Sequence, residues 1–435
     1  MLTYQKYKRK NMFIKSYKLL YEDDSIMKIL IFYASYGGGH LNAAKSINDY
    51  IISNYPNNDV ELIDCMKYVN KTIEKLTTAA YREMAKKAPW AWGKIYSDSQ
   101  KGPLAHLSSR SNKIMAIKLL RLLREKQPDV IISTHPFGSQ MCSYLKRKNK
   151  ITAKIATIMT DFSPHDQWLV GHKFTDYFFV ANDKMKNYLI SKGITENKIS
   201  VTGIPISNRF LKTYNKKEIL DTYNLSEDKF TVLFFGGGEF GLGKTKTAEI
   251  FESFVQESLK EKIQIIAIAG KNPKMKASFK EIVSKYSVNT TTTNTTDITN
   301  NVKILEFTNQ VPELMSISDL VVTKPGGLTT SESLASHLPM LIINPIPGQE
   351  EENAEFLEDK GIAIWLRKND DSKLIIENLL ADSQKLNLMK ENTKLLARPH
   401  STETICKMIL GTEQKIISKF RNHTYYILGD VYGFI

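Results

Sequence analysis

The sequence contains few cysteines and no long apolar run. Its 435 residues include three cysteines, Cys65, Cys142 and Cys406, which lie far apart and form no CxxC pair. A disulfide framework and a cysteine-based zinc site are therefore not expected. The longest apolar runs, such as Met340–Ile343, have the length of a strand, whereas a membrane-spanning helix needs about 18 residues or more. Any contact with a membrane is expected at its surface only.

Acidic residues are scarcer than basic ones. The chain has 60 lysines and arginines against 46 aspartates and glutamates, a net charge of +14. Such an excess attracts anions, and it does not choose among nucleic acid, an anionic lipid surface and a phosphorylated substrate. Residues 1–21 carry six basic residues and no acid, and they lack the apolar centre of a secretory signal. We expect a cytoplasmic protein with a basic N-terminal arm.

Length and composition indicate two globular domains, because 435 residues exceed what one hydrophobic core usually organises. β-rich runs alternate with helix-compatible segments, which predicts an α/β fold with two Rossmann-like, doubly wound domains. The expected units are the basic arm (1–27), a first domain (28–210), a linker (211–229), a second domain (230–397) and a C-terminal tail (398–435).

The strands are expected at short apolar runs that end near glycines or polar residues. They are Lys28–Tyr33, Val130–Ser133, Lys154–Thr160 and Tyr177–Val180 in the first domain, and Phe230–Phe235, Gln264–Ala269, Val302–Leu305, Leu320–Thr323 and Met340–Ile343 in the second. The Thr- and Asn-rich segment 289–301 is too polar for a core and is predicted to be a surface loop. Ligand sites are expected where strands end and helices begin.

The first strand is followed by the turn Gly37-Gly38-Gly39-His40. Glycines let the backbone approach a ligand closely, and the start of the next helix supplies unpaired N–H donors. A histidine in this place can accept a proton at neutral pH. A glycine turn with a capping histidine is an equally good interpretation.

A second polar cluster, Thr160-Asp161-Phe162-Ser163-Pro164-His165, follows another strand. Asp161 could orient His40 or contact a substrate. Asp161, His165 and His172 could in principle bind zinc, but their spacing fits no common ligand pattern and the basic surroundings oppose a cation. No metal site is expected, and a polar loop is the simpler interpretation of the two histidines.

The second domain contains a match to the phosphate-loop pattern. Residues Gly238–Thr245 satisfy G-x-x-x-x-G-K-[ST], which taken alone suggests an ATPase or GTPase. The motif lies halfway along the chain, and no following apolar strand ends in an aspartate that could hold magnesium. The preferred interpretation is a glycine loop that faces a diphosphate, since it relies on the same backbone donors.

Two later segments have both a functional and a structural interpretation. Thr323–Glu332 places small residues and hydroxyls at a helix start, as in a phosphate cradle. Glu332 either accepts ribose hydroxyls or only favours the helix dipole. Gln349 and Glu350 either bind sugar hydroxyls or belong to a turn with solvated acids.

A stretch in the first half interleaves cations with large aromatic side chains. Its members are Arg82, Lys86, Lys87, Trp90, Trp92, Lys94, Tyr96 and Lys101. Tryptophans favour the membrane interface, and each basic group near anionic lipid contributes about 1 kcal/mol. Nucleic-acid binding uses the same residue types. An ordinary helix face with solvated lysines is the alternative to both.

The motifs occur together in a known family. They are YGGGH at 36–40, MTDF at 159–162, VTGIP at 201–205, the segment 323–332, and PGQEEEN at 347–353. From about Lys28 to Ala397 the sequence resembles the processive diacylglycerol glucosyltransferases of Gram-positive bacteria and the monogalactosyldiacylglycerol synthases. Both are similar to the peptidoglycan lipid-linked N-acetylglucosaminyl transferase. The phosphate-loop-like residues Phe240–Lys244 depart from the family pattern.

The resemblance implies a GT-B glycosyltransferase architecture, in which two domains face each other across a cleft. The first domain would take a lipid acceptor and the second a UDP-sugar. The implied catalytic residues are His40 and Asp161. The implied donor residues are Gly237 and Gly238 at the diphosphate, Thr329 and Thr330 at the phosphate, Glu332 at the ribose, and Gln349 and Glu350 at the sugar. The expected acceptor and membrane residues are Gly38, Gly39, Trp90, Trp92 and Lys94.

The function expected from this resemblance is inverting transfer of a hexose from a UDP-sugar to diacylglycerol, with UDP-glucose favoured over UDP-galactose. No metal or cofactor is expected, and the number of sugars added stays open. The expected partners are the donor, diacylglycerol and an anionic membrane surface at the inner face of the cell membrane, not nucleic acid. The alternatives are a phosphate-loop NTPase, a nucleic-acid binder and a two-domain UDP-sugar epimerase.

Overall fold

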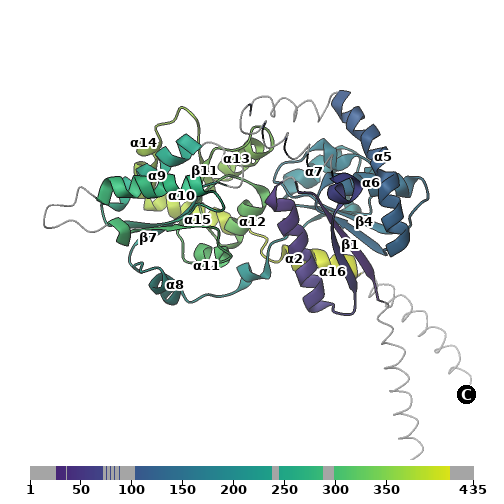
Figure 1. Ribbon diagram of the computed structural model, residues 1–435, viewed down its shortest axis with the longest axis horizontal. Helices are drawn as coiled ribbons and strands as arrows, with labels where there is room; N and C mark the ends of the chain where they lie inside the picture. Colours follow the sequence, from purple (N-terminus) through teal and green to yellow (C-terminus); the bar gives the residue numbers. More distant parts are fainter. Residues whose placement is uncertain are drawn as a thin grey trace, which may run out of the picture.

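The computed structural model describes residues 26–35, 37–71, 103–237, 244–287 and 298–411, with a few single residues between 72 and 102. Within these ranges the chain forms two parallel sheets of six strands, each belonging to one lobe (Figure 1). The purple-to-teal lobe contains the N-terminal half and the green lobe most of the C-terminal half. The expected α/β fold with two doubly wound domains is confirmed.

The first sheet has the strand order β2-β1-β3-β4-β5-β6. Its strands are β1 (Lys28–Tyr33), β2 (Asp59–Asp64), β3 (Val130–Ser133), β4 (Lys154–Ile158), β5 (Tyr177–Val180) and β6 (Ile199–Val201). Alternate residues of β1 enter different cores: Ile29 and Ile31 pack with α2 (Gly38–Asn54), whereas Leu30 and Phe32 pack with α5 (Pro103–Lys126) and α6 (Pro136–Arg147). Helices therefore cover both faces, which explains why the strand is apolar throughout.

The second sheet has the order β12-β11-β10-β7-β8-β9. Its strands are β7 (Phe230–Phe235), β8 (Ile263–Ile268), β9 (Val302–Leu305), β10 (Leu320–Thr323), β11 (Met340–Ile343) and β12 (Ala363–Leu366). The remaining helices are α7 (Asp183–Ser191), α8 (Lys216–Thr222), α9 (Lys244–Ser258), α10 (Pro273–Ser287), α11 (Val311–Ser316), α12 (Gly327–Ala335), α13 (Gln349–Asp359), α14 (Ser372–Ala381), α15 (Ser383–Leu396) and α16 (Ser401–Leu410).

Each sheet has one point at which the strand order reverses. In the first sheet β1 lies between β2 and β3, and in the second β7 lies between β8 and β10. The connections that leave two such neighbouring strands go to opposite sides and open a crevice at their carboxyl ends, where ligands of α/β proteins bind. The turns after β1 and β10, which the sequence singled out, therefore lie at these two points.

The chain passes between the lobes twice, and the two passages are hydrogen-bonded to each other. Ser401 Oγ donates to the Ile204 carbonyl at 2.7 Å, and Thr402 Oγ1 donates to the Ile206 carbonyl at 2.6 Å. At Gly203, φ is +84° and a Cβ would lie 2.5 Å from the Arg398 Cβ. Only glycine fits this crossing without strain, because both the backbone conformation and the space exclude a side chain.

The final described helix, α16, returns to the first lobe. Its buried Ile405, Cys406 and Ile409 belong to the same core as Ile47 of α2, and Figure 1 shows the yellow α16 beside the purple α2. Part of the segment assigned to a tail therefore packs as a helix on the first lobe. The segment assigned to a linker likewise contains α8, whose Leu220 is buried.

The predicted strands are confirmed with small shifts at their ends, and three further strands were missed. β2 is partly exposed along most of its length, β6 has only three residues, and β12 is an edge strand with two partly buried positions. β2 and β6 contain polar residues and are not continuous apolar runs, whereas β12 is a short apolar run that was overlooked. The prediction of a surface loop over 289–301 is wrong at its end, because Ile298 and Asn301 are buried beside β9. The Asn301 amide donates to the Ser258 carbonyl, so a polar side chain is accommodated there.

Candidate active site

A cavity of about 450 Å³ lies at the carboxyl ends of both sheets. Its lining follows β1 and β4 in the first lobe, and β7 to β11 in the second. The lining residues include Gly38, Gly39, His40, Thr160, Asp161, Gly237, Phe307, Lys324, Gly326, Gly327, Thr329, Gln349 and Glu350. Residues that lie far apart in the sequence therefore share one chamber between the two lobes.

His40, the third residue of α2, is held in one orientation by the first lobe. Its Nδ1 lies 2.7 Å from the Thr134 carbonyl oxygen and 2.9 Å from Thr160 Oγ1. Because a carbonyl oxygen only accepts, Nδ1 carries the hydrogen and Nε2 keeps its lone pair. Burial lowers the pKa of His40 to about 4, against the opposing effect of the bond to Thr134. The imidazole is therefore neutral at pH 7, with one nitrogen available as a base.

A second histidine and a tryptophan surround His40. The ring centroid of His135 lies 4.6 Å from that of His40 in an edge-to-face arrangement, and the buried Trp168 ring lies at 6.5 Å. Burial, followed by the proximity of His40, lowers the pKa of His135 well below its usual value. Neither Thr134 nor His135 was predicted from the sequence as a site residue. Their position directly after β3, which adjoins β1 in the sheet, was the available signal.

Asp161 joins the first lobe to the second. The side-chain amides of Gln349 and Asn353, both on α13, lie near enough to its carboxylate to lower its pKa. Burial, with a smaller contribution from the charges of Glu350 and Glu352, raises the pKa of Asp161 to about 7 against the opposing effect of the Gln349 and Asn353 amides. Asp161 Oδ2 is buried without a hydrogen-bond partner among the described residues. The carboxylate therefore retains an acceptor position for a further group.

The sequence left open whether Asp161 orients His40, and the contacts of the two residues bear on this alternative. Among the described residues, His40 is oriented by Thr134 and Thr160, and no hydrogen bond joins it to Asp161. The two residues do line the same cavity. The other alternative, contact of Asp161 with a substrate, stays a prediction.

Asn353 is a further link between the lobes, and it was named in the motif without a role. It is fully buried, its Oδ1 accepts the Phe162 N–H at 2.9 Å, and its Nδ2 donates to the Pro325 carbonyl at 3.0 Å. The ring of Phe162 lies 5.8 Å from that of Phe356, also on α13. One amide thus fixes the loop after β4 against the loop after β10.

The start of α12 touches the first lobe directly. A Cβ on Gly327 would lie 1.9 Å from the Thr160 carbonyl oxygen, so this position cannot carry a side chain without moving the lobes apart. Thr160 is also the residue beside His40 Nδ1. The close approach at Gly327 thus brings the N-terminus of α12 next to the histidine.

Two helices begin at the cavity without a cap. α2 and α12 start after Gly37 and Gly326, which supply no capping side chain, and neither has an acid in its first turn. By contrast, α7, α8 and α14 are capped by Asn182, Asn215 and Asp371. Unpaired N–H groups and the positive end of the helix dipole form an anion site. The cavity is therefore prepared for a phosphate-like group.

Lys324, which lies within the predicted segment Thr323–Glu332 but was assigned no role there, is a cation in the cavity wall. Burial lowers the pKa of Lys324, against the attraction of Glu350. Burial likewise raises the pKa of Glu350, and Lys324 together with the Ile346 N–H opposes this rise. Desolvation thus outweighs the mutual attraction of the two groups. Glu350 Oε2 accepts the Ile346 N–H at 2.7 Å, which fixes the carboxylate in its own loop.

The other predicted donor residues differ in their exposure to the cavity. Thr329 lines it, whereas Thr330 is fully buried and its hydroxyl lacks a partner among the described residues. Glu332 is half-buried and lies three residues after Thr329, on the same side of α12. Burial raises the pKa of Glu332 to about 8.

Some predicted residues lie outside the described residues. They are Gly238, Trp90, Trp92, Lys94 and most of the phosphate-loop-like segment. His165 and His172 have local roles: His165 Nδ1 accepts the Gln167 N–H, and His172 Nδ1 hydrogen-bonds to the Leu169 carbonyl. Within the described ranges, no cluster of three metal-binding side chains occurs and no helix is long and apolar enough to span a bilayer.

Similar proteins were found for both halves of the chain. Residues 40–206 match the family model of monogalactosyldiacylglycerol (MGDG) synthase, and residues 232–405 match that of the glycosyltransferase family 28 C-terminal domain. The chain is 30% identical over 398 residues to the processive diacylglycerol beta-glucosyltransferase of Bacillus licheniformis, and the alignment covers 90% of this chain and 96% of that protein.

Solved structures share the fold at low sequence identity. MurG of Acinetobacter baumannii aligns with a TM-score of 0.54 at 13% identity, over 89% of this chain and 100% of that one. The UDP-GlcNAc 2-epimerase of Neisseria meningitidis, solved with UDP-GlcNAc, aligns with a TM-score of 0.56 at 16% identity, also over 89% and 100%. The two lobes therefore have the GT-B arrangement. The chain belongs to the diacylglycerol glycosyltransferases, the family of the MGDG synthases and the processive diacylglycerol beta-glucosyltransferases, with a C-terminal domain of glycosyltransferase family 28.

Proposed function

We propose that this protein transfers a hexose from a UDP-sugar, with UDP-glucose favoured, to the free hydroxyl of diacylglycerol and inverts the anomeric centre. One observation carries the proposal. A single cavity brings the neutral, oriented His40 of one lobe together with the uncapped α12 N-terminus and Lys324 of the other. A base and an anion site on opposite walls are what displacement of a diphosphate by an alcohol requires.

The donor is assigned to the second lobe, residues 230–397. The diphosphate would accept hydrogen bonds from the α12 N-terminus, with Thr329, Gly237 and Lys324 around it. Gly238 would extend the turn at Gly237. Thr330 stays a candidate phosphate contact in this assignment, since its buried hydroxyl lacks a partner among the described residues. The N. meningitidis epimerase of the same fold was solved with UDP-GlcNAc, which supports a nucleotide sugar as the ligand.

The ribose and the sugar are assigned to carboxylates and amides. Glu332 lies one turn beyond the cavity-lining Leu328 and Thr329, where it can accept two ribose hydroxyls. Gln349 and Glu350 line the cavity beside Asp161 and can bind the hydroxyls of the hexose. An exposed aromatic ring, Phe307, lies at the same cavity and offers a flat surface to the uracil.

The acceptor is assigned to the first lobe, residues 28–210, beside Gly38, Gly39 and His40. The hydroxyl oxygen attacks the anomeric carbon, its proton passes to His40 Nε2, and the bond from the anomeric carbon to the phosphate oxygen breaks. UDP leaves with the electron pair, and the N–H groups of α12 with Lys324 stabilise its charge. Attack opposite to the leaving group yields a β-linked hexose. Asp161 Oδ2 is available to hold a hydroxyl of either substrate.

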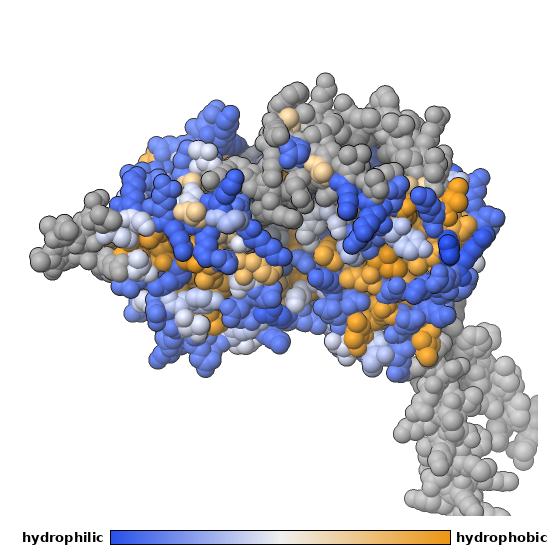
Figure 2. Space-filling model, viewed as in Figure 1, coloured by the Kyte–Doolittle hydropathy of each residue, from blue (hydrophilic) through white to orange (hydrophobic). Residues whose placement is uncertain are grey.

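A membrane-bound acceptor requires contact with the bilayer surface, and we assign this contact to the first lobe. Figure 2 shows apolar side chains gathered over that lobe. On the face covered by α5 it carries the exposed residues Tyr68 and Ile117, and α5 adds Lys118, Arg121 and Arg124 around Ile117. Apolar side chains flanked by cations favour an anionic membrane. Trp90, Trp92 and Lys94, outside the described residues, stay predicted members of this surface.

The deciding experiment is a transfer assay with the purified full chain. Anionic phospholipid vesicles with diacylglycerol receive labelled UDP-glucose or UDP-galactose, and the lipids are separated by thin-layer chromatography. We expect a β-linked glucosyl diacylglycerol, and no labelled lipid on matched vesicles without diacylglycerol. Conversion of the UDP-sugar to its epimer without lipid would favour the epimerase. Magnesium-dependent release of phosphate from ATP, lost in Lys244→Ala, would favour the NTPase.

A further inference from the structure

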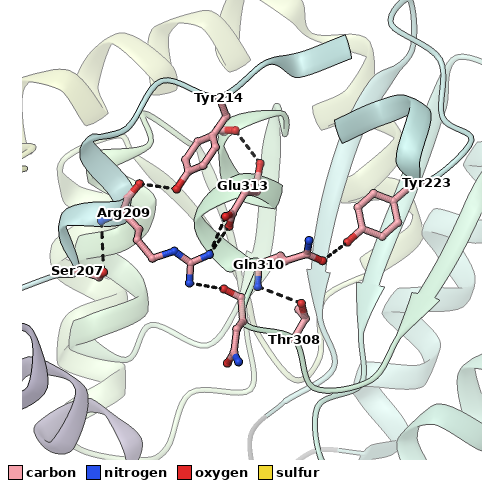
Figure 3. Close-up of polar contacts among 9 residues, drawn as sticks. Ser207, Arg209, Tyr214, Tyr223, Thr308, Gln310 and Glu313 are labelled. Atoms are coloured by element: carbon pink, nitrogen blue, oxygen red, sulfur yellow. Dashed lines mark hydrogen bonds and ion pairs between the residues drawn. The ribbon is translucent and has the colours of Figure 1, made fainter. Parts of the chain in front are cut away.

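The segment between the lobes, residues 207–223, contacts the outer side of one wall of the cavity through polar side chains (Figure 3). We call this segment the connector. Arg209 lies on the short helix η4 (Asn208–Leu211), just after the first lobe. Its Nη2 contacts both carboxylate oxygens of Glu313 on α11, at 2.7 and 2.9 Å. Its Nη1 donates to the Asn309 carbonyl at 2.7 Å. One guanidinium therefore holds both a helix and the loop that precedes it.

Two tyrosines of the connector make further hydrogen bonds that support this contact. Tyr214 OH donates to the Arg209 carbonyl at 2.8 Å, and Tyr223 OH donates to Gln310 Oε1 at 2.8 Å. The Gln310 N–H in turn donates to Thr308 Oγ1 at 3.0 Å. The loop from 307 to 310 is thus attached to the connector at successive residues. We call Arg209, Tyr214, Tyr223 and their partners Gln310 and Glu313 the connector clamp.

The loop that the connector contacts also lines the cavity, on the side that faces away from the connector. Phe307, Thr308 and Val311 line the cavity, whereas Asn309, Gln310 and Glu313 contact the connector. Phe307 is 58% exposed, and the Lys271 ammonium lies 4.7 Å from its ring centroid. The clamp contacts at 309, 310 and 313 therefore orient an exposed part of the wall that has little packing of its own.

The ion pair of the connector clamp is suited to orienting the loop at 307–311 more than to stabilising the folded protein. The side chains of Arg209 and Glu313 are 40% and 21% exposed, and ion pairs with this access to water contribute little to folding. The planar guanidinium nevertheless fixes distance and angle, because Nη2 contacts both Glu313 oxygens while Nη1 donates to the Asn309 carbonyl. The third contact, to the Asn309 carbonyl, lies next to Thr308, so the constraint is passed directly to a cavity residue.

We infer that Arg209 and Glu313 are positioning residues for the donor end of the cavity, which hold residues 307–311 in the shape that receives the nucleotide. Neither residue lines the cavity, so both act through the loop. The inference rests on the proposed function, because it takes the nucleotide of a UDP-sugar as the occupant of this end. It predicts an effect on donor affinity and none on the chemical step, which takes place at His40.

The test compares Arg209→Met with Glu313→Gln in the full chain. Calorimetry gives the Kd for UDP, and initial rates on diacylglycerol vesicles give KM for the UDP-sugar and kcat. Arg209→Met should raise Kd and KM about tenfold with kcat nearly unchanged, since it removes charged hydrogen bonds to both Glu313 and Asn309. Glu313→Gln should raise them about threefold, because the Asn309 contact stays. Arg209→Lys should lie between Arg209→Met and the wild type.

The chain offers a matched control in Arg367→Met. Arg367 makes an ion pair of the same kind with Glu358, at 2.7 and 3.3 Å, in the same lobe, and neither residue lines the cavity. The control should melt at a temperature close to that of Arg209→Met and bind UDP like the wild type. Should Arg209→Met melt much lower, Glu313→Gln and Tyr223→Phe, which keep the side-chain shape, provide the comparison.

The outcomes separate this inference from the proposed function. Wild-type affinity for UDP in both Arg209→Met and Glu313→Gln would overturn the inference alone, and so would a loss of kcat at unchanged KM. A wild-type protein that binds no UDP would overturn the proposed function and this inference with it. A weakened UDP affinity in the clamp variants, with the control unchanged, would support it.

Discussion

The two walls of the cavity are built from the same succession of elements, but they differ in the charge of their side chains. Each consists of a parallel strand, a glycine turn and an uncapped helix, β1 to α2 on one side and β10 to α12 on the other. In the first wall, burial keeps His40 neutral, with its pKa near 4, and raises the pKa of Asp161 to about 7. In the second wall, Lys324 and Glu350 line the cavity as a cation and an anion that attract each other. The first wall is therefore suited to proton transfer and the second wall to anion binding, although both are built from the same elements.

The difference arises from the first residues of each helix. In α2 the third residue is a histidine whose Nδ1 is fixed by Thr134 from a neighbouring strand. In α12 the corresponding turn is small and hydroxylated, and Gly327 is pressed against Thr160. The first wall thus orients a side chain, whereas the second leaves its backbone donors open. Substitutions that impair one wall and spare the other can test this division.

The largest effect is expected for His40→Ala, which removes the base from the first wall. General base catalysis contributes typically 10² to 10⁴, so kcat should fall by about 10³. The Kd for UDP should stay unchanged, because the second wall is intact. Rates at saturating donor and calorimetry with UDP measure the two quantities. His400→Ala, at an exposed histidine paired with Glu403, is the control. Turnover near the wild-type rate in His40→Ala would remove this residue as the base.

Asn353→Ala should disturb the alignment of the two walls, because Asn353 hydrogen-bonds to a loop of each lobe. It leaves the buried Phe162 N–H and Pro325 carbonyl without their partner, at about 1–3 kcal/mol for each group. Because the walls then lose their alignment, kcat/KM should fall about 10²-fold. Asn392→Ala removes a comparable amide contact, to the Gly361 carbonyl, away from the cavity. If both variants lose stability and neither loses kcat/KM, the bridge is structural only.

Lys324→Met should weaken the second wall and spare the first. The Kd for UDP should rise about tenfold, as expected when a charged hydrogen bond is lost, while kcat at saturating donor changes little. The salt dependence of UDP binding should also decrease. Lys229→Met is the control, since Lys229 bonds to Asn301 at the amino ends of the strands, away from the cavity. Equal affinities of the two variants would show that Lys324 does not contact the diphosphate.

The smallest effect is expected for the pH dependence of Glu332. Burial raises its pKa to about 8, so at pH 7 most of the carboxyl is protonated. Only the ionised form accepts two ribose hydroxyls, and UDP affinity should therefore rise about threefold between pH 7 and pH 9. Glu332→Gln should bind more weakly at pH 9 and lose this rise. Calorimetry at both pH values is the measurement, and an identical rise in the variant would contradict the ribose contact.

The fold could be predicted from the sequence because parallel strands covered on both faces are continuous apolar runs. In Lys28–Tyr33 the four consecutive apolar residues after Lys28 are buried, and in Ile263–Ile268 all six residues are buried, with Gln264 as the one polar residue. Asp59–Asp64 escaped prediction because, at the sheet edge, its polar residues stay partly exposed. His40 could be located as a candidate because it lies at the glycine turn that follows β1, whereas Lys324, directly after β10, was not assigned a role.

By itself, the sequence determined which residues end a strand beside a glycine turn, and therefore which backbone donors and side chains are available at the cavity. Only the tertiary structure decided their partners. Thr134 meets His40 across 94 positions, Asn353 meets Phe162 across 191, and Arg209 meets Glu313 across 104. Local patterns of hydrophobicity reflect neighbours along the chain, whereas these contacts depend on how two separate sheets dock. The resulting burial, which no single segment contains, sets the pKa values of His40 and Asp161.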